Sequence, residues 1–581
     1  MRQMAIDLEW SIETGAFRCG SWYDGENLYG STNFAVVNSA LGMFGDEQIA
    51  IIGHNITSDL TKLLEWGVSI PHNFVLQDSL LLARLLHPEQ PTKELKPFAR
   101  QYGFQWKDEH ETTDANVLLD YCGRDTFASC SMFKILRQEM TVVQKRLFKF
   151  HSQLQLAMFV CEVAGMKVDV GCLTEDKLAR SAALSKLACR LPANVLTNDG
   201  VFREWLAEHF TEKQLQVLPW TATHKKSVGV KGLRLLPVLK DKQECEVFLA
   251  IQQARELQDY YSLYIERPSS LTTVSGFFHP GYKHLVAKTH RRSTEPAIQN
   301  WPAGARKIFV SRFEGGKIVS FDYKNLEARL FAWEANCQSF LSALLEGGYP
   351  RIAEIAFGWE KITKQNPKYT VLKSLVLAVM YNMSVGGFKY GLLVDHNIDI
   401  TWHEAQDYVD RFFTKFPEIH MERERRKTFA HKFGYCQSYV GARLMLPSLP
   451  KEVFPEEQAK WKQKHLENKA VNFPTQNLAS YVTGGAMIDS VTAIMGQYNQ
   501  TRGEYLQNAH YSAQGGKCIM PVFPIAEVHD ELVFDCAATE VGWLIATMKH
   551  CMVNVVTLQK LLCPTFNCPL DVDVSVGETW T

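Results

Sequence analysis

GKIVSFDYKNLEARLFAW, residues 316–333, changes its hydrophobic period midway from that of a β-strand to that of an α-helix. Residues 318–321 predict an apolar strand that ends at Asp322, and the spacing of the leucines after it predicts a helix. Near the C-terminal end, IAEVHDELVFDC (residues 525–536) predicts two short strands that meet around Asp530 and Glu531. Two acids at strand tips suit a pair of metal ions, although a single strand-end Asp is more often a turn residue.

A second set of acids lies in the first 136 residues. MAIDLEWS (residues 4–11) alternates, so Asp7 and Glu9 share one face of a predicted strand. Asp59 lies near the start of a predicted helix, and Tyr121 and Asp125, four residues apart, share a face of another helix. Each piece alone is typical of a surface acid or a helix cap. Together they predict a site for Mg²⁺ or Mn²⁺, which prefer carboxylate oxygens.

Composition indicates a globular chain of several domains. Of the 581 residues, 46% are hydrophobic and 22% charged, which predicts two to four packed domains and excludes a disordered protein. The net charge of -1 gives no hint of a nucleic-acid partner. Any surface that binds nucleic acid therefore has to be local, as in the basic segment KHLVAKTHRR (residues 283–292). The 14 cysteines form no CxxC pair, and no signal peptide or long apolar run is present, so we expect a soluble intracellular protein with free thiols.

In combination, these segments resemble two known sets of motifs. The three N-terminal segments resemble the Exo I, II and III motifs of DnaQ-like 3′-5′ exonucleases. FDYKNLEARLFA (residues 321–332), YTVLKSLVLAVMYN (369–382) and EVHDELVF (527–534) resemble motifs A, B and C of family A (DNA polymerase I-like) DNA polymerases. TEPAIQNWP (294–302) and AVNFPTQNLAS (470–480) agree with that family in the same order. The resemblance covers nearly the whole chain, and the length together with the missing 5′-nuclease domain points to the bacteriophage type.

The resemblance implies an α/β multidomain fold, in which an RNase H-like 3′-5′ exonuclease domain precedes a right-hand polymerase domain. The expected domains are the exonuclease (1–147), thumb (148–275), first part of the palm (276–345), fingers (346–455) and second part of the palm (456–581). Because Exo I begins a few residues from the start, we expect no upstream 5′-nuclease domain. The distance from Asp169 to a helix near Ile251 predicts a thumb without a processivity-factor loop.

The resemblance also assigns site residues, with two Mg²⁺ or Mn²⁺ ions at each active site. In the exonuclease the expected metal ligands are Asp7, Glu9, Asp59 and Asp125, and Tyr121 would orient the attacking water. In the polymerase, Asp322, Asp530 and the carbonyl of Tyr323 would hold the metals, with Glu531 and Arg329 in the catalytic set. Glu327 would exclude ribonucleotides, Lys373 would bind the triphosphate and Tyr381 would lie beside the templating base. The expected DNA contacts are Arg291, Gln299, Asn300, Asn472, Gln476 and His529, and Arg291 and Gln476 would donate into the primer-terminal minor groove.

Several positions depart from the family pattern. Motif B normally has an Arg where this chain has Tyr369, and Arg351 is the candidate that would replace its charge. Asn382 replaces the Gly after Tyr381, while His290 and Asn477 replace glycines beside the two minor-groove residues. Because only G·C pairs carry an amino group in that groove, polar additions there suggest a polymerase that copies genomes containing 2-aminoadenine.

The expected partners are primer-template DNA, dNTPs and phage replisome proteins, and we expect a monomer without a membrane, in the cytoplasm of a bacterial host. Three alternatives remain: a stand-alone exonuclease, a non-catalytic nucleic-acid-binding protein and a single-subunit RNA polymerase. The intact acids of motifs A and C disfavour the first, and the exonuclease acids disfavour the second. Glu327 disfavours the third, because its side chain would exclude a 2′-hydroxyl. A primer-template assay with Mg²⁺, run with and without dNTPs and again with NTPs, distinguishes all three.

Overall fold

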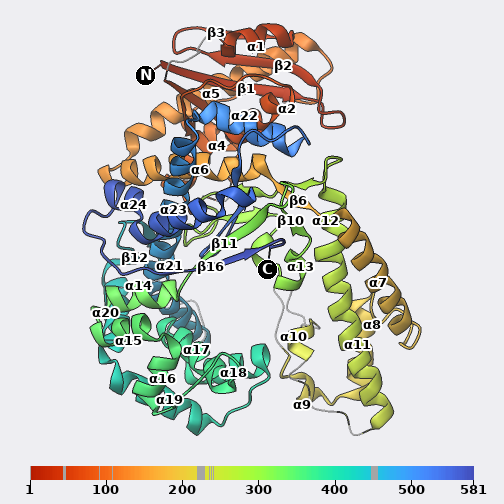
Figure 1. Ribbon diagram of the computed structural model, residues 1–581, viewed down its shortest axis with the longest axis vertical. Helices are drawn as coiled ribbons and strands as arrows, with labels where there is room; N and C mark the ends of the chain where they lie inside the picture. Colours follow the sequence, from red (N-terminus) through yellow and green to blue (C-terminus); the bar gives the residue numbers. More distant parts are fainter. Residues whose placement is uncertain are drawn as a thin grey trace. The chain divides into compact units, whose positions relative to one another are not determined.

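The structure is a computed structural model (Figure 1). It describes residues 2–42, 48–90, 92–107, 109–218, 229–233, 236, 239, 241–446 and 456–580. The chain divides into two compact units. Unit 1 comprises residues 1–167, 279–330 and 426–581, and unit 2 comprises residues 168–278 and 331–425.

The N-terminal part of unit 1 is a five-stranded sheet in the order β3-β2-β1-β4-β5. β1 runs antiparallel to β2 and parallel to β4, and every residue of β4 is buried, as expected for a strand covered on both faces. The strands are β1 (Arg2–Trp10), β2 (Phe17–Tyr23), β3 (Leu28–Ser31), β4 (Ile49–Gly53) and β5 (Phe74–Asp78). The helices are α1 (Phe34–Gly42), α2 (Ile56–Glu65), α3 (Ser79–Leu86), α4 (Leu95–Ala99), η1 (Arg100–Tyr102) and α5 (Ala115–Glu139). α5 packs against β1 and β2 and so brings a helix onto the strand that carries Asp7.

A long helix follows this sheet, exposed along one side of its first turns and largely buried after them. This helix, α6 (Val142–Ala164), begins with a capping box at Thr141 and packs against β14 (Val522–Val528), α21 (Glu456–Gln497) and α22 (Arg502–Ala513). The predicted boundary at residue 147 falls inside α6, because hydrophobic period indicates a helix without indicating which body the helix packs on. The predicted domain boundaries remain predictions, and the one at 455 lies outside the described residues.

The second sheet of unit 1 has four antiparallel strands in the order β14-β15-β11-β16 (Figure 1). They are β14 (Val522–Val528), β15 (Glu531–Cys536), β11 (Lys317–Tyr323) and β16 (Val572–Gly577). The predicted strand before Asp322 and the two strands around Asp530 are confirmed. Other elements of unit 1 are β8 (Gly281–Lys283), β9 (Ser293–Glu295), η3 (Ile298–Asn300), α13 (Ala303–Arg306), β10 (Phe309–Val310), β12 (Tyr435–Gln437), β13 (Arg443–Met445), α21 (Glu456–Gln497), α22 (Arg502–Ala513), η4 (Ala538–Glu540), α23 (Val541–Asn554) and α24 (Val556–Leu561).

Two segments of unit 1 have the length and hydropathy of a membrane span, residues 462–497 and 538–561. In the first segment, 78% of the most apolar 18-residue window is buried inside the protein, as expected for a helix of the protein core. The second is interrupted at Val555, whose φ is 40°. Its longest helix, α23, has 14 residues. It is therefore about 21 Å long, too short for a hydrocarbon core of about 30 Å.

Unit 2 is mostly helical. Its first segment contains α7 (Val170–Ala188), α8 (Asp199–His209), α9 (Glu212–Leu215), α10 (Val230–Leu233), α11 (Lys242–Tyr261), the π-helical turn η2 (Ser262–Glu266), α12 (Arg267–Leu271) and β7 (Phe277–Phe278). A core that includes Phe202, Trp205, Phe248 and Ile251 holds α8 against α11. Its second segment contains α15 (Gln338–Glu346), α16 (Tyr349–Phe357), α17 (Pro367–Met380), α18 (Val385–His396) and α19 (Trp402–Lys415). Three of the described elements contain residues of both units: β6 (Met166–Val168), α14 (Leu326–Glu334) and α20 (Pro417–Phe433).

Candidate active sites

The N-terminal acids converge as predicted. Asp7 and Glu9 project from β1 and Asp125 from α5, and one carboxylate oxygen from each lies within 4.8 Å of the others. Asp59, in the first turn of α2, accepts a hydrogen bond from the Leu8 amide at 3.1 Å. Asp7, Glu9 and Asp59 also line a cavity of about 790 Å³. The structure therefore brings together residues from three elements spread over 118 positions of sequence, Asp7 to Asp125.

The electrostatics of this site favour a bound cation. Burial, together with the neighbouring carboxylates, raises the pKa of Asp7 well above its usual range, and burial raises the pKa of Asp59 likewise. Burial and Asp125 raise the pKa of Glu9 to about 7. Asp7 Oδ2 is buried and has no hydrogen-bond partner. Buried, mutually repelling oxygens of this kind fit a divalent cation, which would compensate their charge.

Four side chains complete the site and were not found from the sequence. Lys96 donates to the Tyr121 hydroxyl, and its ammonium lies 4.3 Å from the centre of the tyrosine ring. Trp106 Nε1 donates to Asp125 Oδ1 at 2.6 Å. Arg18 and His110 line the cavity and add positive charge near Glu9. Lys96, Trp106 and His110 lie between α3 and α5, where no repeating hydrophobic pattern marks a role.

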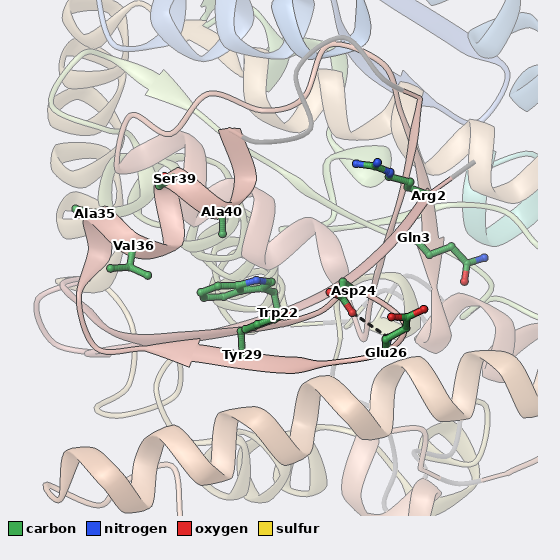
Figure 2. A pocket seen from close by; sticks show the side chains of 10 residues that line it. All are labelled: Arg2, Gln3, Trp22, Asp24, Glu26, Tyr29, Ala35, Val36, Ser39 and Ala40. Atoms are coloured by element: carbon green, nitrogen blue, oxygen red, sulfur yellow. Dashed lines mark hydrogen bonds between the residues drawn. The ribbon is translucent and has the colours of Figure 1, made fainter.

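A separate cavity of about 960 Å³ lies between α1 and the strands β1 to β3 (Figure 2). Trp22 and Tyr29 stack in it with ring centres 5.7 Å apart, and the Asp24 carboxylate accepts from the amides of Glu26 and Asn27. Trp22 pairs with Ile6 in the sheet. Because adjacent residues of a strand face opposite sides, Trp22 lies on the other face from Asp7. This cavity is therefore distinct from the carboxylate site.

The four-stranded sheet of unit 1 positions the second pair of acids. Asp322 is the exposed, next-to-last residue of β11 and pairs in register with Glu531. Asp530 lies in the turn between β14 and β15, and its carbonyl accepts from the Tyr323 amide at 3.3 Å. Burial raises the pKa of Asp530, and the Arg291 guanidinium partly opposes that rise. Two acids held side by side at strand ends fit a Mg²⁺ or Mn²⁺ site. The Tyr323 side chain donates instead to the Met552 carbonyl at 2.7 Å, so only its backbone is available to such a site.

Two residues predicted to belong to the catalytic set, Glu531 and Arg329, have partners within the protein. Both oxygens of Glu531 are used within the fold, because Arg306 Nη1 and Trp580 Nε1 each donate to it at 3.0 Å. Arg329 is 2% exposed and lies 4.0 Å from Asp571. These contacts come from segments far along the chain from Glu531 and Arg329. The assignment of both residues to the catalytic set stays a prediction.

Arg291 and Glu327, predicted to contact the primer and the sugar, form an ion pair with one another. The residue before Arg291, His290, has a φ of 61°, in the left-handed region that suits Gly and that His adopts more readily than most other residues. His290 Nδ1 lies 2.9 Å from the Tyr481 hydroxyl. Asn477 is fully buried; it donates to the Thr289 carbonyl at 3.1 Å and accepts from Ser438 at 2.6 Å.

The remaining predicted DNA contacts are also in unit 1. Asn472 and Gln476 lie four residues apart on α21 and so share a face. The buried atoms Asn472 Oδ1 and Gln299 Nε2 have no hydrogen-bond partner. His529 is exposed in the turn before Asp530, with a φ of 58°, and Asn300 ends η3. The contacts of these residues with DNA stay predictions.

The predicted fingers residues lie in unit 2. Lys373 is exposed on α17, and Tyr381 caps the C-terminal end of that helix. Arg351 lies 2.7 Å from Glu354 and 3.7 Å from Glu346, so two acids already balance the charge proposed to replace the motif B arginine. Asn382 has a φ of 56°, which explains why it stands where the family has Gly.

The sequence model of DNA polymerase family A matches residues 204–581, more than half of the chain. The chain belongs to DNA polymerase family A. This family A chain is 23% identical over 546 residues to the thermostable DNA polymerase I of Thermus aquaticus, covering 90% of the chain and 57% of that protein. It is 28% identical over 377 residues to DNA polymerase I of Pseudomonas aeruginosa, covering 63% of the chain and 36% of that protein. The chain thus spans little more than half of one relative and about a third of the other.

A solved structure shares the fold of the family A chain. It is the POL domain of Pol1 from M. smegmatis, determined in complex with DNA primer-template and dNTP. The TM-score is 0.78 and the identity 19%, and the match covers 100% of this chain and 96% of that one. At this identity the likeness establishes the fold. The strand that carries Asp322 and the turn that carries Asp530 both lie within residues 204–581.

Proposed function

We propose that the chain is a template-directed DNA polymerase that adds dNTPs to a primer 3′ end and removes mispaired nucleotides with its own 3′-5′ exonuclease. Membership of family A supports the polymerase half. One observation carries the exonuclease half: Asp7, Glu9 and Asp125 converge within 4.8 Å, and a buried oxygen of Asp7 lacks a partner. Surface acids or helix caps would not gather at such an electrostatic cost.

In the proposed exonuclease, Asp7, Glu9, Asp59 and Asp125 hold two divalent cations. When bound, these cations supply activation of a water and stabilisation of the leaving oxygen. Tyr121 orients the attacking water, and Lys96 holds the tyrosine hydroxyl in place. Trp106 holds Asp125 in one orientation by donating to Oδ1. Arg18 and His110 attract the phosphates of a single strand to the cavity, whose volume suits a small number of nucleotides.

In the proposed polymerase, Asp322, Asp530 and the Tyr323 carbonyl would hold two divalent cations. Bound there, such cations would supply charge stabilisation for the transfer of the nucleotide to the primer 3′-oxygen. Glu327 excludes the 2′-hydroxyl of a ribonucleotide, and its ion pair with Arg291 holds the carboxylate in place. Arg291 and Gln476 donate to acceptors common to all correct base pairs, while Lys373 provides a point charge for the triphosphate. Tyr381 lies beside the templating base.

The biological setting is a further part of the proposal. We propose a monomeric replicative enzyme of a bacteriophage that works with phage replisome proteins in the cytoplasm of a bacterial host. The 2-aminoadenine hypothesis rested on His290 and Asn477. Both side chains have partners within the protein, and packing alone accounts for them. Competition between dATP and the 2-aminoadenine triphosphate opposite template T, in the unchanged protein and in Asp7→Ala, tests what is left of that hypothesis.

A primer-template assay with Mg²⁺ tests the proposed function. With dNTPs the primer should lengthen, and without dNTPs it should shorten from its 3′ end. NTPs should not support extension. Extension without any shortening would contradict the exonuclease, shortening without extension would contradict the polymerase, and efficient use of NTPs would indicate an RNA polymerase.

A further inference from the structure

A third cavity, of about 770 Å³, lies in unit 1 where α5 ends, α6 begins and β5 passes beneath them. Its floor is buried and largely apolar, with Leu76 at 1%, Phe133 at 2%, Met140 at 6% and Phe148 at 8% exposed. The rings of Phe133 and Phe148 lie 5.7 Å apart. A concave site of this volume with an apolar floor is typical of small-ligand pockets.

The rim of this cavity is basic. α5 contributes Lys134 and Arg137, and α6 contributes Lys145 and Lys149, all four exposed. No Asp or Glu of the described residues lines the cavity. Lys134 lies over the ring of Tyr23 at 5.3 Å. Among the described residues, Arg137, Lys145 and Lys149 have no ion-pair or hydrogen-bond partner. The positive charge of this rim is therefore not balanced within the described part of the protein.

The placement of the two α6 lysines is unfavourable for the helix. Lys145 and Lys149 are four residues apart, so their like charges repel on one helix face. Lys145 lies four residues after the N-cap Thr141, where the helix dipole disfavours a cation, and no acid occupies the first turn. An anionic ligand at the rim would relieve both effects.

A buried amide points to a ligand as well. Gln77 on β5 lines the cavity and is 9% exposed, and its Oε1 is buried without a hydrogen-bond partner. A buried carbonyl oxygen in that state loses its hydration without compensation. A ligand that donates an N–H into the floor would supply the missing bond. Ser152, also in the lining, already donates to the Leu76 carbonyl and leaves Gln77 as the polar group without a partner on this floor.

We propose that this cavity binds a nucleotide, either free or within a single DNA strand, at a site separate from both active sites. The phosphate contacts the four rim cations, the base lies on the apolar floor, and an amino group of the base donates to Gln77 Oε1. A nucleotide combines these three properties in one small unit. Acidic peptide side chains offer negative charge but neither a flat apolar face nor an N–H donor. The site is independent of the proposed polymerase and exonuclease chemistry.

Photocross-linking of the full chain tests this site. One probe is a short thymidine oligonucleotide carrying 5-iododeoxyuridine, and the other is 8-azido-dATP; EDTA prevents degradation of both. After irradiation, mass spectrometry should locate cross-links in peptides that cover residues 130–152. Lys145→Ala with Lys149→Ala should lower the yield about tenfold or more. Arg146→Ala is the matched control, because Arg146 is an exposed cation of the same helix that does not line the cavity.

Gln77→Leu separates base recognition from charge. It keeps the rim and the side-chain volume but removes the acceptor, so the yield with 8-azido-dATP should fall several-fold. Cross-linking by the oligonucleotide alone identifies a DNA strand as the ligand, and cross-linking by 8-azido-dATP alone identifies a free nucleotide. Either result supports the site. Primer extension by every variant should match that of the unchanged chain, which verifies folding.

Three results would overturn the proposal. The first is the absence of cross-links in residues 130–152 with both probes. The second is a yield that the paired lysine variant leaves unchanged. The third is displacement of the probes by a glutamate-rich peptide but not by unlabelled oligonucleotide or dATP, which would identify an acidic protein segment as the ligand.

Discussion

At the scale of single residues, Asp7 and Asp530 separate the two proposed activities. Asp7→Ala removes the carboxylate with the buried unpartnered oxygen. Release of nucleotides from a single-stranded 3′ end should fall about a thousandfold or more, while primer extension stays near normal. Asp530→Ala should do the reverse, because Asp530 belongs to the proposed polymerase site, in the turn between β14 and β15. Loss of both activities in either variant, with an unchanged circular dichroism spectrum, would contradict two separate sites.

Trp106 tests whether the orientation of Asp125 matters. Trp106→Phe keeps an aromatic ring but removes the N–H that donates to Asp125 Oδ1 at 2.6 Å. Outer contacts of metal ligands typically contribute about 10- to 100-fold, so exonuclease kcat should fall by about tenfold or more at fixed Mg²⁺. Trp10→Phe is the matched control, because Trp10 is another tryptophan near the site and lines the cavity beside Asp7 and Glu9. Equal activity of Trp106→Phe and the unchanged chain would remove this role.

Glu327 tests the proposed exclusion of ribonucleotides. Its side chain is 17% exposed and pairs with Arg291. Glu327→Ala opens space beside the sugar, so kcat/KM for an rNTP relative to the matching dNTP should rise about tenfold or more. Glu314→Ala removes an exposed carboxylate elsewhere in unit 1 and should leave the ratio unchanged. Unaltered discrimination in Glu327→Ala would place the exclusion of ribonucleotides on another residue.

At the scale of elements, α6 carries a buried acid that makes stability depend on pH. Glu162 accepts a hydrogen bond from the Tyr282 amide, and burial raises its pKa from 4.5 to about 8. Between these values the unfolded chain has lost the proton and the folded chain retains it. The folded state therefore loses stability as pH rises from 4.5 to 8, in total on the order of 5 kcal/mol, since each pKa unit corresponds to about 1.4 kcal/mol.

Glu162→Gln should remove this dependence, because an amide keeps the acceptor for the Tyr282 N–H and does not ionise. Urea unfolding at pH 5 and at pH 8 measures the change. The variant should be more stable than the unchanged chain at pH 8 and similar to it near pH 5. Glu314→Gln, at an exposed position, should follow the unchanged chain at both values. Parallel pH profiles of Glu162→Gln and the unchanged chain would show that Glu162 is ionised in the folded state.

At the scale of the whole molecule, unit 1 is assembled from three stretches of chain that are far apart in sequence. A buried ion pair joins two of them: Arg292, from the second stretch, contacts Glu527, from the third, and both side chains are 4% exposed. Arg292 also donates to the carbonyl and hydroxyl of Ser480 on α21. A buried charge pair of this kind specifies how these distant stretches meet.

Removing one partner of this pair should be costly. Arg292→Met leaves Glu527 buried without its cation and should lower the free energy of unfolding by about 3–5 kcal/mol. Arg292→Met combined with Glu527→Leu should recover part of that loss, because no charge is then left uncompensated. Urea titration of the single and double variants measures both values. A double variant no more stable than Arg292→Met would show that the pair is not coupled.

Local pattern in the sequence was sufficient for the strands and helices that carry the acids. Side-chain period is a property of a few consecutive residues, so Asp7 with Glu9, Tyr121 with Asp125, and the strand before Asp322 were all predicted on the elements where the structure has them. The order of the motifs predicted membership of family A, which the sequence comparison confirms. These conclusions needed no knowledge of which elements touch.

Contacts between distant residues were decided only in the tertiary structure. Glu531 contacts Arg306 and Trp580, and Arg329 lies near Asp571, although no local pattern connects these segments. Packing of α6 onto β14 and α21, and the meeting of α5, α6 and β5 around Gln77, are likewise invisible in sequence period. The physical reason is that burial and pairing depend on where the chain returns in space, whereas periodicity reports only which side of one element a residue faces.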